Sequence, residues 1–346
     1  MIANFAVTYR CTSRCRTCNI WAIGEPVREE LTLGEIRDFF EANSEFLEGV
    51  SSIQITGGEP FLREDLPELV SAIRQHIPRC SFWIPTNGLD PPWIEEATAT
   101  MLKELDGRGL GVSVSIDGLE EAHDEIRGVE GGFRRAVETL KRLSALRRLH
   151  PRLGLTVGMT TTPGNLGEIE GVYQLAIEHR AEFSVRPISF SDVYYRNAGG
   201  EALSEESAAH LIPVFRRIAR DSFERKGLWK TVPTIRYLQG VLDHILDPRG
   251  RTLPCSAASD SFFIDPYGDV YPCIFMDAVL GNIRETPMEE IYMSPGASDA
   301  RRAINDLECP NCWVECEAFR DINRDTRGSV STALKALLDA STLGIG

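Results

Sequence analysis

Three cysteines stand close together near the start of the chain. Cys11, Cys15 and Cys18 follow an apolar run at residues 2–7 and have the spacing C-x3-C-x2-C. A structural zinc site or a fully protein-ligated iron–sulfur cluster uses four ligands, so this set is one ligand short. Three thiolates can each bind one iron of a [4Fe-4S] cluster and leave the fourth iron open to a substrate or cofactor. Taken alone, the spacing also fits a zinc site.

The segment Gly57-Gly58-Glu59-Pro60 is a second set of residues suited to ligand binding. Adjacent glycines allow the backbone to approach a ligand closely, and the carboxylate of Glu59 can attract a cationic amine. Asn87 is a further polar candidate, although an Asn before a Gly is also a common turn residue. These residues predict a site for a molecule that carries an amino group.

A second group of cysteines lies toward the end of the chain: Cys255, Cys273, Cys309, Cys312 and Cys316. Residues 262–273 predict a hairpin, with an apolar strand, an Asp-Pro-Tyr-Gly turn and a second strand that ends at Cys273. The C-x2-C pair at 309–312 is also typical of a zinc site. Nine cysteines form an odd count in a chain without an export signal, which favours metal or cluster binding over disulfides. Cys80 stands apart and is expected to be a buried apolar residue.

Composition excludes several classes of function. The chain has 346 residues, with 37 Lys and Arg against 51 Asp and Glu, a formal net charge of −14. Such an acidic balance argues against nucleic acid as a partner. The N-terminal residues lack the pattern of a signal peptide, and no apolar run approaches the ~20 residues of a membrane helix. We therefore expect a cytoplasmic protein with no membrane partner.

The elements that must position these motifs alternate between strand and helix over the first two hundred residues. Strands are expected at residues 2–9, 52–56, 82–86, 112–117, 155–160 and 183–186, each followed by a helical pattern. This alternation predicts six parallel βα units in an α/β fold. The fourth and fifth strands carry polar residues on one face, which indicates a barrel lumen that holds a polar ligand. Ligands of parallel barrels bind where the strands end, and four of the motifs fall there.

The remaining chain predicts three further regions. Helical patterns cover about 203–225 and 232–246, the Asp-Pro-Arg-Gly segment at 247–250 marks a boundary, and a last helix is expected at 331–339. We divide the chain into a barrel at 1–200, a helical connector at 201–250, a cysteine-rich domain at 251–320 and a helical tail at 321–346.

Together, the cysteine loop, the Gly-Gly-Glu-Pro element and the polar end of the fourth strand resemble the radical S-adenosylmethionine enzymes, whose fold is a partial (β/α)6 TIM-like barrel. The resemblance implies that S-adenosylmethionine binds the open iron. Gly57, Gly58 and Glu59 would then hold its amine, while Ser115 and Asp117 would face the ribose or the methionyl group. Arg127 would contact the cofactor carboxylate or form a salt bridge with Asp124.

One position departs from the family pattern. The residue before the third cysteine is usually aromatic in this family, but it is Thr17 in this chain. Adenine is therefore expected to contact Trp21 or the backbone of the fifth strand near Met159.

The C-terminal cysteines are similar to the SPASM domain, or its shorter twitch form, of one branch of the same family. That resemblance implies one auxiliary [4Fe-4S] cluster, held by Cys255, Cys273, Cys309 and Cys312, with Cys316 as a substitute or spare ligand.

The activity implied by the resemblance is reductive cleavage of S-adenosylmethionine to a 5′-deoxyadenosyl radical, which abstracts hydrogen from a substrate. The outcome would be oxidation, cross-linking, epimerisation or rearrangement of a peptide or small molecule, with an external electron donor such as flavodoxin or ferredoxin. Arg186 is a possible contact for an anion, and no catalytic acid or base stands out. A leader-binding domain for a peptide would be a separate protein. The alternatives are a non-catalytic iron–sulfur electron carrier and a zinc-stabilised binding protein.

Overall fold

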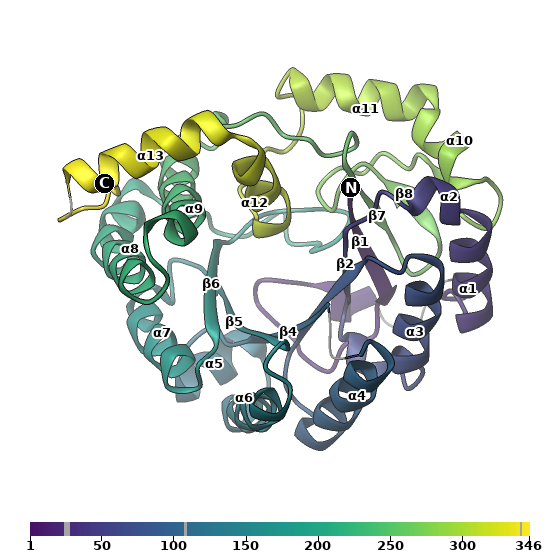
Figure 1. Ribbon diagram of the computed structural model, residues 1–346, viewed down its shortest axis with the longest axis horizontal. Helices are drawn as coiled ribbons and strands as arrows, with labels where there is room; N and C mark the ends of the chain where they lie inside the picture. The colour runs from purple at the N-terminus through teal and green to yellow at the C-terminus, as the bar shows by residue number, and fades with distance from the viewer. Residues whose placement is uncertain (24–27, 107–108, 340) are drawn as a thin grey trace.

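One nine-stranded sheet organises the molecule (Figure 1). The computed structural model describes residues 1–23, 28–106, 109–339 and 341–346. The strand order is β6-β5-β4-β3-β2-β1-β7-β8-β9, and β1 to β6 are parallel neighbours in chain order. Their bounds are β1 Ile2–Thr8, β2 Ser52–Gly57, β3 Ser81–Thr86, β4 Leu110–Ser115, β5 Gly154–Thr161 and β6 Glu182–Pro187. With β6 at one edge, the six strands form an open barrel, which confirms the predicted partial (β/α)6 fold.

Helices cover the outer face of the curved sheet (Figure 1). They are α1 Leu33–Ala42, α2 Ser44–Leu47, α3 Leu66–His76, α4 Pro91–Glu104, α5 Glu120–Arg127, α6 Gly132–Leu149 and α7 Ile169–Glu178, with short 3-10 helices at Ile20–Ile23, Pro60–Leu62 and Leu166–Glu168. Thr32 and Glu35 form a capping box at the start of α1. Asp65 precedes α3, but its carboxylate binds the Arg63 guanidinium and leaves the helix amides uncapped.

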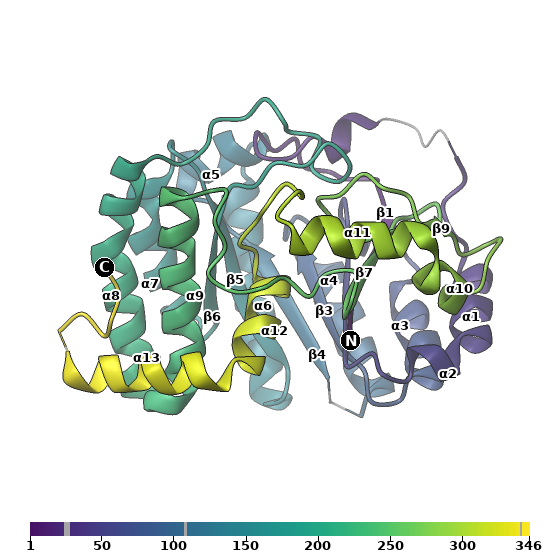
Figure 2. The ribbon, with the colours of Figure 1, turned by 90° about the horizontal axis from the view of Figure 1, so that it is seen from above.

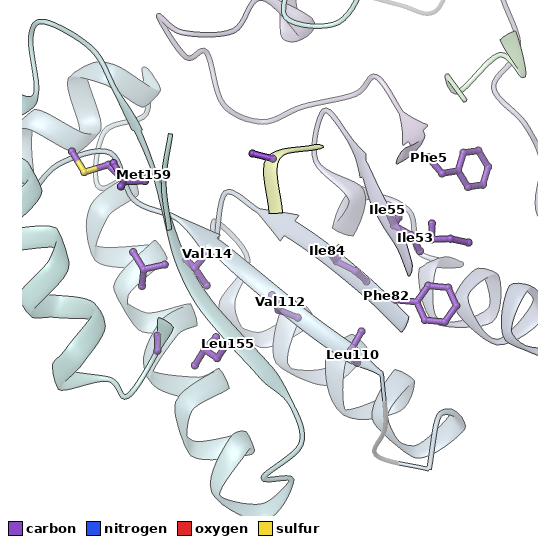
Figure 3. Packing of buried hydrophobic residues seen from close by; sticks show 14 of the residues in the cluster. Phe5, Ile53, Ile55, Phe82, Ile84, Leu110, Val112, Val114, Leu155 and Met159 are labelled. Atoms are coloured by element: carbon purple, nitrogen blue, oxygen red, sulfur yellow. The ribbon is translucent and has the colours of Figure 1, made fainter. Parts of the chain in front are cut away.

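The two faces of the sheet differ in polarity, as the strand patterns predict. Phe82, Ile84, Val112, Val114 and Leu155 pack on the helix side and are at most 1% exposed (Figure 3). Burial of this alternating apolar set is the main force that holds the helices on the sheet. The opposite face is left with polar side chains around the lumen.

The C-terminal half continues the same sheet. After α8 Glu205–Lys226 and α9 Leu228–Leu246, the strands β7 Ser261–Ile264, β8 Asp269–Tyr271 and β9 Gly281–Asn282 follow, and then α10 Met288–Met293, α11 Pro295–Asn305, α12 Glu315–Arg324 and α13 Thr326–Leu338. The predicted hairpin is present as β7 and β8, but β7 also pairs in parallel with β1. The sequence patterns do not show this pairing, which joins the cysteine-rich region directly to the barrel. The divisions at residues 200, 250 and 320 stay predictions.

No helix in the described part of the chain is long and apolar enough to cross a membrane.

Candidate active site at the open end of the barrel

A cavity of about 1200 Å³, its open mouth included, lies where the strands of the barrel end. It brings together most of the residues that the sequence analysis selects: Cys11, Cys15, Cys18, Gly57, Gly58, Glu59, Asn87, Ser115, Arg127 and Cys316. The residues outside its lining are Asp117, Cys255, Cys273, Cys309 and Cys312. Ten predicted residues from distant parts of the chain therefore share one wall.

Backbone contacts from two other segments hold the cysteine loop in place. The amides of Arg14 and Arg16 donate to the carbonyls of Arg127 and Ile126 at 2.9 and 2.8 Å, at the end of α5. The amide of Asn19 donates to the Tyr195 carbonyl at 2.7 Å, in the segment after β6. Figure 2 shows the loops after β1 and after β6 side by side at one end of the barrel. The three thiols are thus presented by a fixed loop.

The chemistry of this loop fits an iron–sulfur cluster. Burial raises the pKa of the Cys11 thiol to about 12 and that of Cys18 to about 11, so thiolates form here only beside a cation such as cluster iron. Ser13 Oγ and Trp21 Nε1 are buried and have no hydrogen-bond partner among the described residues, and both residues line the cavity. No three described His, Cys, Asp or Glu side chains converge on a single ion. A [4Fe-4S] cluster instead spreads its ligands over different irons.

The two glycines after β2 are needed for contact with the protein's own backbone. A Cβ at Gly57 would lie 2.1 Å from the Thr8 carbonyl oxygen, and one at Gly58 would lie 2.2 Å from that of Arg10. Gly57 also has a φ of 133°, which favours glycine. The expectation that these glycines admit a ligand is therefore incomplete: they first let the β2 loop pack on the end of β1, and they line the cavity as a result.

Glu59 is a buried carboxyl at the cavity wall. It is 4% exposed and accepts hydrogen bonds from the amides of Asn87 at 2.6 Å and Phe61 at 3.2 Å. Burial raises the pKa of this carboxyl to about 7, against the lowering effect of those amides. A cationic amine beside Glu59 would stabilise its ionised form, so the site suits an amino group. Asn87, predicted as a ligand or a turn residue, lines the same wall and donates from Nδ2 to Thr12 Oγ1 at 3.0 Å.

Asp117 does not face the cavity. It is fully buried, accepts a hydrogen bond from the Thr160 amide at 2.8 Å, and pairs through Oδ2 with Arg127 Nε at 2.7 Å. Its predicted contact with the ribose or the methionyl group stays a prediction. The salt bridge predicted between Arg127 and Asp124 is wrong, because Asp124 accepts from the amides of Gly131 and Phe133 instead. Arg127 itself reaches the cavity, with Nη1 3.8 Å from Cys15 Sγ.

Two tyrosines and a glutamate at the cavity were missed by the sequence analysis. Tyr194 Oη contacts the backbone of Gly57 at 3.0 Å and Thr56 Oγ1 at 2.6 Å, and Tyr195 lies beside it. Glu315 enters from the C-terminal region and pairs with β6. The Tyr-Tyr pair after the sixth strand was a usable sign, since strand ends line such sites. No sequence pattern marked Glu315, except its place between Cys312 and Cys316.

The residues expected near adenine lie in different places. Trp21 lines the cavity, with the Arg14 guanidinium 5.5 Å from its ring centroid. Met159 is 1% exposed and packs in the core on the helix side of β5 (Figure 3). Thr17 lines the cavity, and its carbonyl accepts from Asn197 Nδ2 at 2.8 Å.

The five C-terminal cysteines belong to, or pack against, one cluster of apolar residues, which also includes Phe263 and Tyr194. Burial raises the pKa of the Cys255 thiol to about 11 and that of Cys273 to about 12. Cys316 alone among the five lines the cavity. The structure thus places the second cysteine group against the wall of the first site.

Two family models match the chain. One describes the radical SAM superfamily and matches residues 5–176; the other, SPASM, describes an iron–sulfur cluster-binding domain and matches residues 255–316. The second description names iron–sulfur chemistry where the cysteine spacing left zinc open. Each model covers one of the two cysteine groups.

Similar proteins include the AdoMet-dependent heme synthase of Methanosarcina barkeri, 27% identical over 87% of this chain and 84% of its own. The subtilosin biosynthesis protein AlbA of Bacillus subtilis is 26% identical over 85% of this chain, which spans only 59% of AlbA. A solved structure, native anSMEcpe with bound AdoMet and Cp18Cys peptide, has a TM-score of 0.62 at 17% identity and covers 98% of both chains.

Because the family models, the fold and the cysteine sites agree, the chain belongs to the radical SAM superfamily and carries a SPASM domain; its cofactors are a [4Fe-4S] cluster with S-adenosylmethionine and auxiliary iron–sulfur clusters.

Proposed function

We propose that this protein removes a hydrogen atom from a C–H bond of a peptide held in the barrel lumen. When bound, the barrel cluster and S-adenosylmethionine supply a 5′-deoxyadenosyl radical, which can break such bonds. The protein itself binds and orients the peptide and excludes water from the lumen. The observation that carries the proposal is a pair of opposite charges on the cavity wall, Arg186 and Glu315.

On the cofactor side, the proposal assigns cluster binding to Cys11, Cys15 and Cys18. The Gly57–Glu59 segment holds the cofactor amine, and Ser115 and Arg127 lie within the same lining for its polar groups. Asp117 acts through Arg127, whose guanidinium it fixes at 2.7 Å. Its role is therefore to position Arg127.

On the substrate side, Arg186 and Glu315 form a dipolar pair. Arg186 Nη1 lies 3.9 Å from Glu315 Oε2, and its Nε donates to Thr160 Oγ1 at 3.1 Å. The Nη groups make no hydrogen bond to any described residue. Ser184 Oγ holds the Glu315 carboxylate from the same strand. A peptide group matches this pair, because its carbonyl accepts from a guanidinium and its N–H donates to a carboxylate.

Relatives add support of two kinds. AlbA is named for the biosynthesis of a bacteriocin, and the anSMEcpe structure contains a peptide. The heme synthase name points to a second candidate, a small molecule with carboxylate groups. The free Nη donors of Arg186 favour this alternative as well, since guanidinium groups bind carboxylates in pairs of hydrogen bonds.

For the SPASM domain we propose one auxiliary [4Fe-4S] cluster with Cys255, Cys273, Cys309 and Cys312 as ligands and Cys316 as a substitute. An external electron donor of the flavodoxin or ferredoxin class would reduce the barrel cluster. The four divisions of the chain, at 1–200, 201–250, 251–320 and 321–346, belong to the same proposal.

Deuterium transfer tests the substrate class. The anaerobically reconstituted protein is mixed with dithionite, S-adenosylmethionine and extracts of bacteria grown in D2O, separated into a peptide fraction and a small-molecule fraction. Mass spectrometry then measures deuterium in 5′-deoxyadenosine. We expect deuterium from the peptide fraction. Deuterium from the small-molecule fraction alone, or from neither fraction, would overturn the peptide proposal.

A variant pair locates the substrate contact. Arg186→Gln is expected to form 5′-deoxyadenosine but to lose most of its deuterium, because the peptide carbonyl has lost its donor. Arg142→Gln is the matched control, since Arg142 pairs with Glu95 and Glu138 on the outer helices. Equal deuterium transfer in both variants would remove Arg186 from the substrate site.

A further inference from the structure

Four charged side chains are buried beside the C-terminal cysteines: Arg251, Glu317, Arg320 and Asp321. Their side chains are between 4% and 6% exposed. Arg251 Nη2 lies 3.3 Å from Asp321 Oδ2, and Arg320 pairs with Glu317 and, through Nε at 3.5 Å, with Asp321. Burying charges costs several kcal/mol per ion even when they are paired. A network of four therefore needs a reason beyond stability.

The network surrounds the thiols of the SPASM domain. Arg251 Nη1 donates to the Cys312 carbonyl at 2.9 Å, and Glu317 follows Cys316 directly in the chain. Ser256, the residue directly after Cys255, donates from Oγ to the carboxylate of Asp321. These charges and the cluster ligands thus share one enclosed site.

One donor of the network lacks an acceptor. Arg320 Nη1 is buried and has no hydrogen-bond partner among the described residues. A buried donor of a charged group that lacks an acceptor is destabilising. The other nitrogens of the same guanidinium are taken by Glu317 and Asp321. Arg320 lies four residues after Cys316 on α12, and residues at this spacing share one face of a helix.

We propose that Arg320 Nη1 donates a hydrogen bond to a sulfur atom of the auxiliary cluster, and that Arg320 and Glu317 set the reduction potential of that cluster in opposite directions. The inference rests on the SPASM cluster and is independent of the substrate. Hydrogen bonds to sulfur and nearby charge are general determinants of cluster potentials. A reduced cluster carries one more negative charge, so Arg320 favours reduction and Glu317 opposes it.

The test measures the potential of the auxiliary cluster alone. The full chain is prepared with Cys11, Cys15 and Cys18 changed to Ala, which leaves only the C-terminal cluster to be reconstituted. Electron paramagnetic resonance then follows a potentiometric titration without S-adenosylmethionine or substrate. We expect Arg320→Gln to shift the one-electron equilibrium at least tenfold toward the oxidised cluster, a potential lower by about 59 mV. Arg320→Lys, which keeps the charge, should restore at least half of the shift.

Glu317→Gln gives the decisive sign. If the network acts through charge, Glu317→Gln raises the reduction potential of the cluster, opposite to the change expected for Arg320→Gln. A merely structural role predicts no such opposite shift. Arg236→Gln is the matched control, because it breaks the Arg236–Asp325 pair between α9 and the start of α13. Potentials of Arg320→Gln and Glu317→Gln that are unchanged, or that move in the same direction, would overturn the proposal. If Arg320→Gln fails to hold a cluster, the sign for Glu317→Gln decides alone.

Discussion

The two cysteine groups of this protein differ in their position relative to the cavity. Cys11, Cys15 and Cys18 sit on a loop at the mouth of an open cavity. The C-terminal cysteines lie among buried aromatic side chains and a buried charge network, with only Cys316 at the cavity. All three cysteines of the first group line the cavity, whereas only one of the five in the second group does.

This difference separates two tasks. An accessible iron with an open position can bind a small molecule, and the adjoining cavity provides the room. A cluster bound by protein ligands suits electron transfer, because the surrounding protein sets its reduction potential and limits the access of water.

The largest effect is expected for Cys15→Ala. Loss of this ligand should lower the formation of 5′-deoxyadenosine to the level of the protein without cluster, because no other described side chain in the loop replaces the thiolate. Chromatography of the reaction with dithionite and S-adenosylmethionine measures it. Cleavage at the wild-type rate would show that the loop does not hold the working cluster.

Cys273→Ala should separate the two tasks. Cleavage of S-adenosylmethionine is expected to persist within about threefold of wild type, while deuterium transfer from the substrate fraction is lost. The same assay with deuterated extract reports both quantities. Parallel loss of both in Cys273→Ala and Cys15→Ala would contradict the division.

The pH dependence of cofactor binding should be smaller. Burial raises the pKa of Glu59 to about 7, so its carboxyl becomes neutral as the pH falls from 7.5 to 6 and no longer attracts an amine. We expect the dissociation constant for S-adenosylmethionine to rise about tenfold over this range. Anaerobic calorimetry checks it, and Glu59→Gln should flatten the difference. An equal slope in that variant would assign the titration to another group.

Gly57→Ala tests whether the close backbone contact between Gly57 and Thr8 stabilises the fold around the cavity. The added Cβ would meet the Thr8 carbonyl at 2.1 Å in a backbone with φ of 133°, so we expect the free energy of unfolding to fall by ~2–4 kcal/mol. Gly167→Ala, with no atom within 4 Å of the added Cβ, should change it by less than about 0.5 kcal/mol. Denaturant titration compares the two variants, and similar values would contradict the contact.

Local patterns predicted much of the barrel. The polar faces of β4 and β5 and the hairpin before Cys273 are short-range features, and the structure contains them. Pairings between distant residues escaped prediction. The parallel contact of β7 with β1 joins residues more than 250 positions apart, and no periodicity encodes it.

Arg127 shows why partners inside the site were harder to predict. Helical spacing favours Asp124 as its partner, but that carboxylate holds the start of α6, and α5 directs Arg127 back to the end of β4. The choice between two nearby carboxylates depends on the packing of three elements. Glu315 was missed for the same reason, since its place at the cavity depends on how the SPASM domain docks on β6.

The most direct test of the account is cleavage of S-adenosylmethionine by the reconstituted wild-type protein. Dithionite is added anaerobically to the protein with its barrel cluster filled, and 5′-deoxyadenosine and methionine are measured. The account predicts both products in equal amounts. A filled cluster that yields neither product would contradict it.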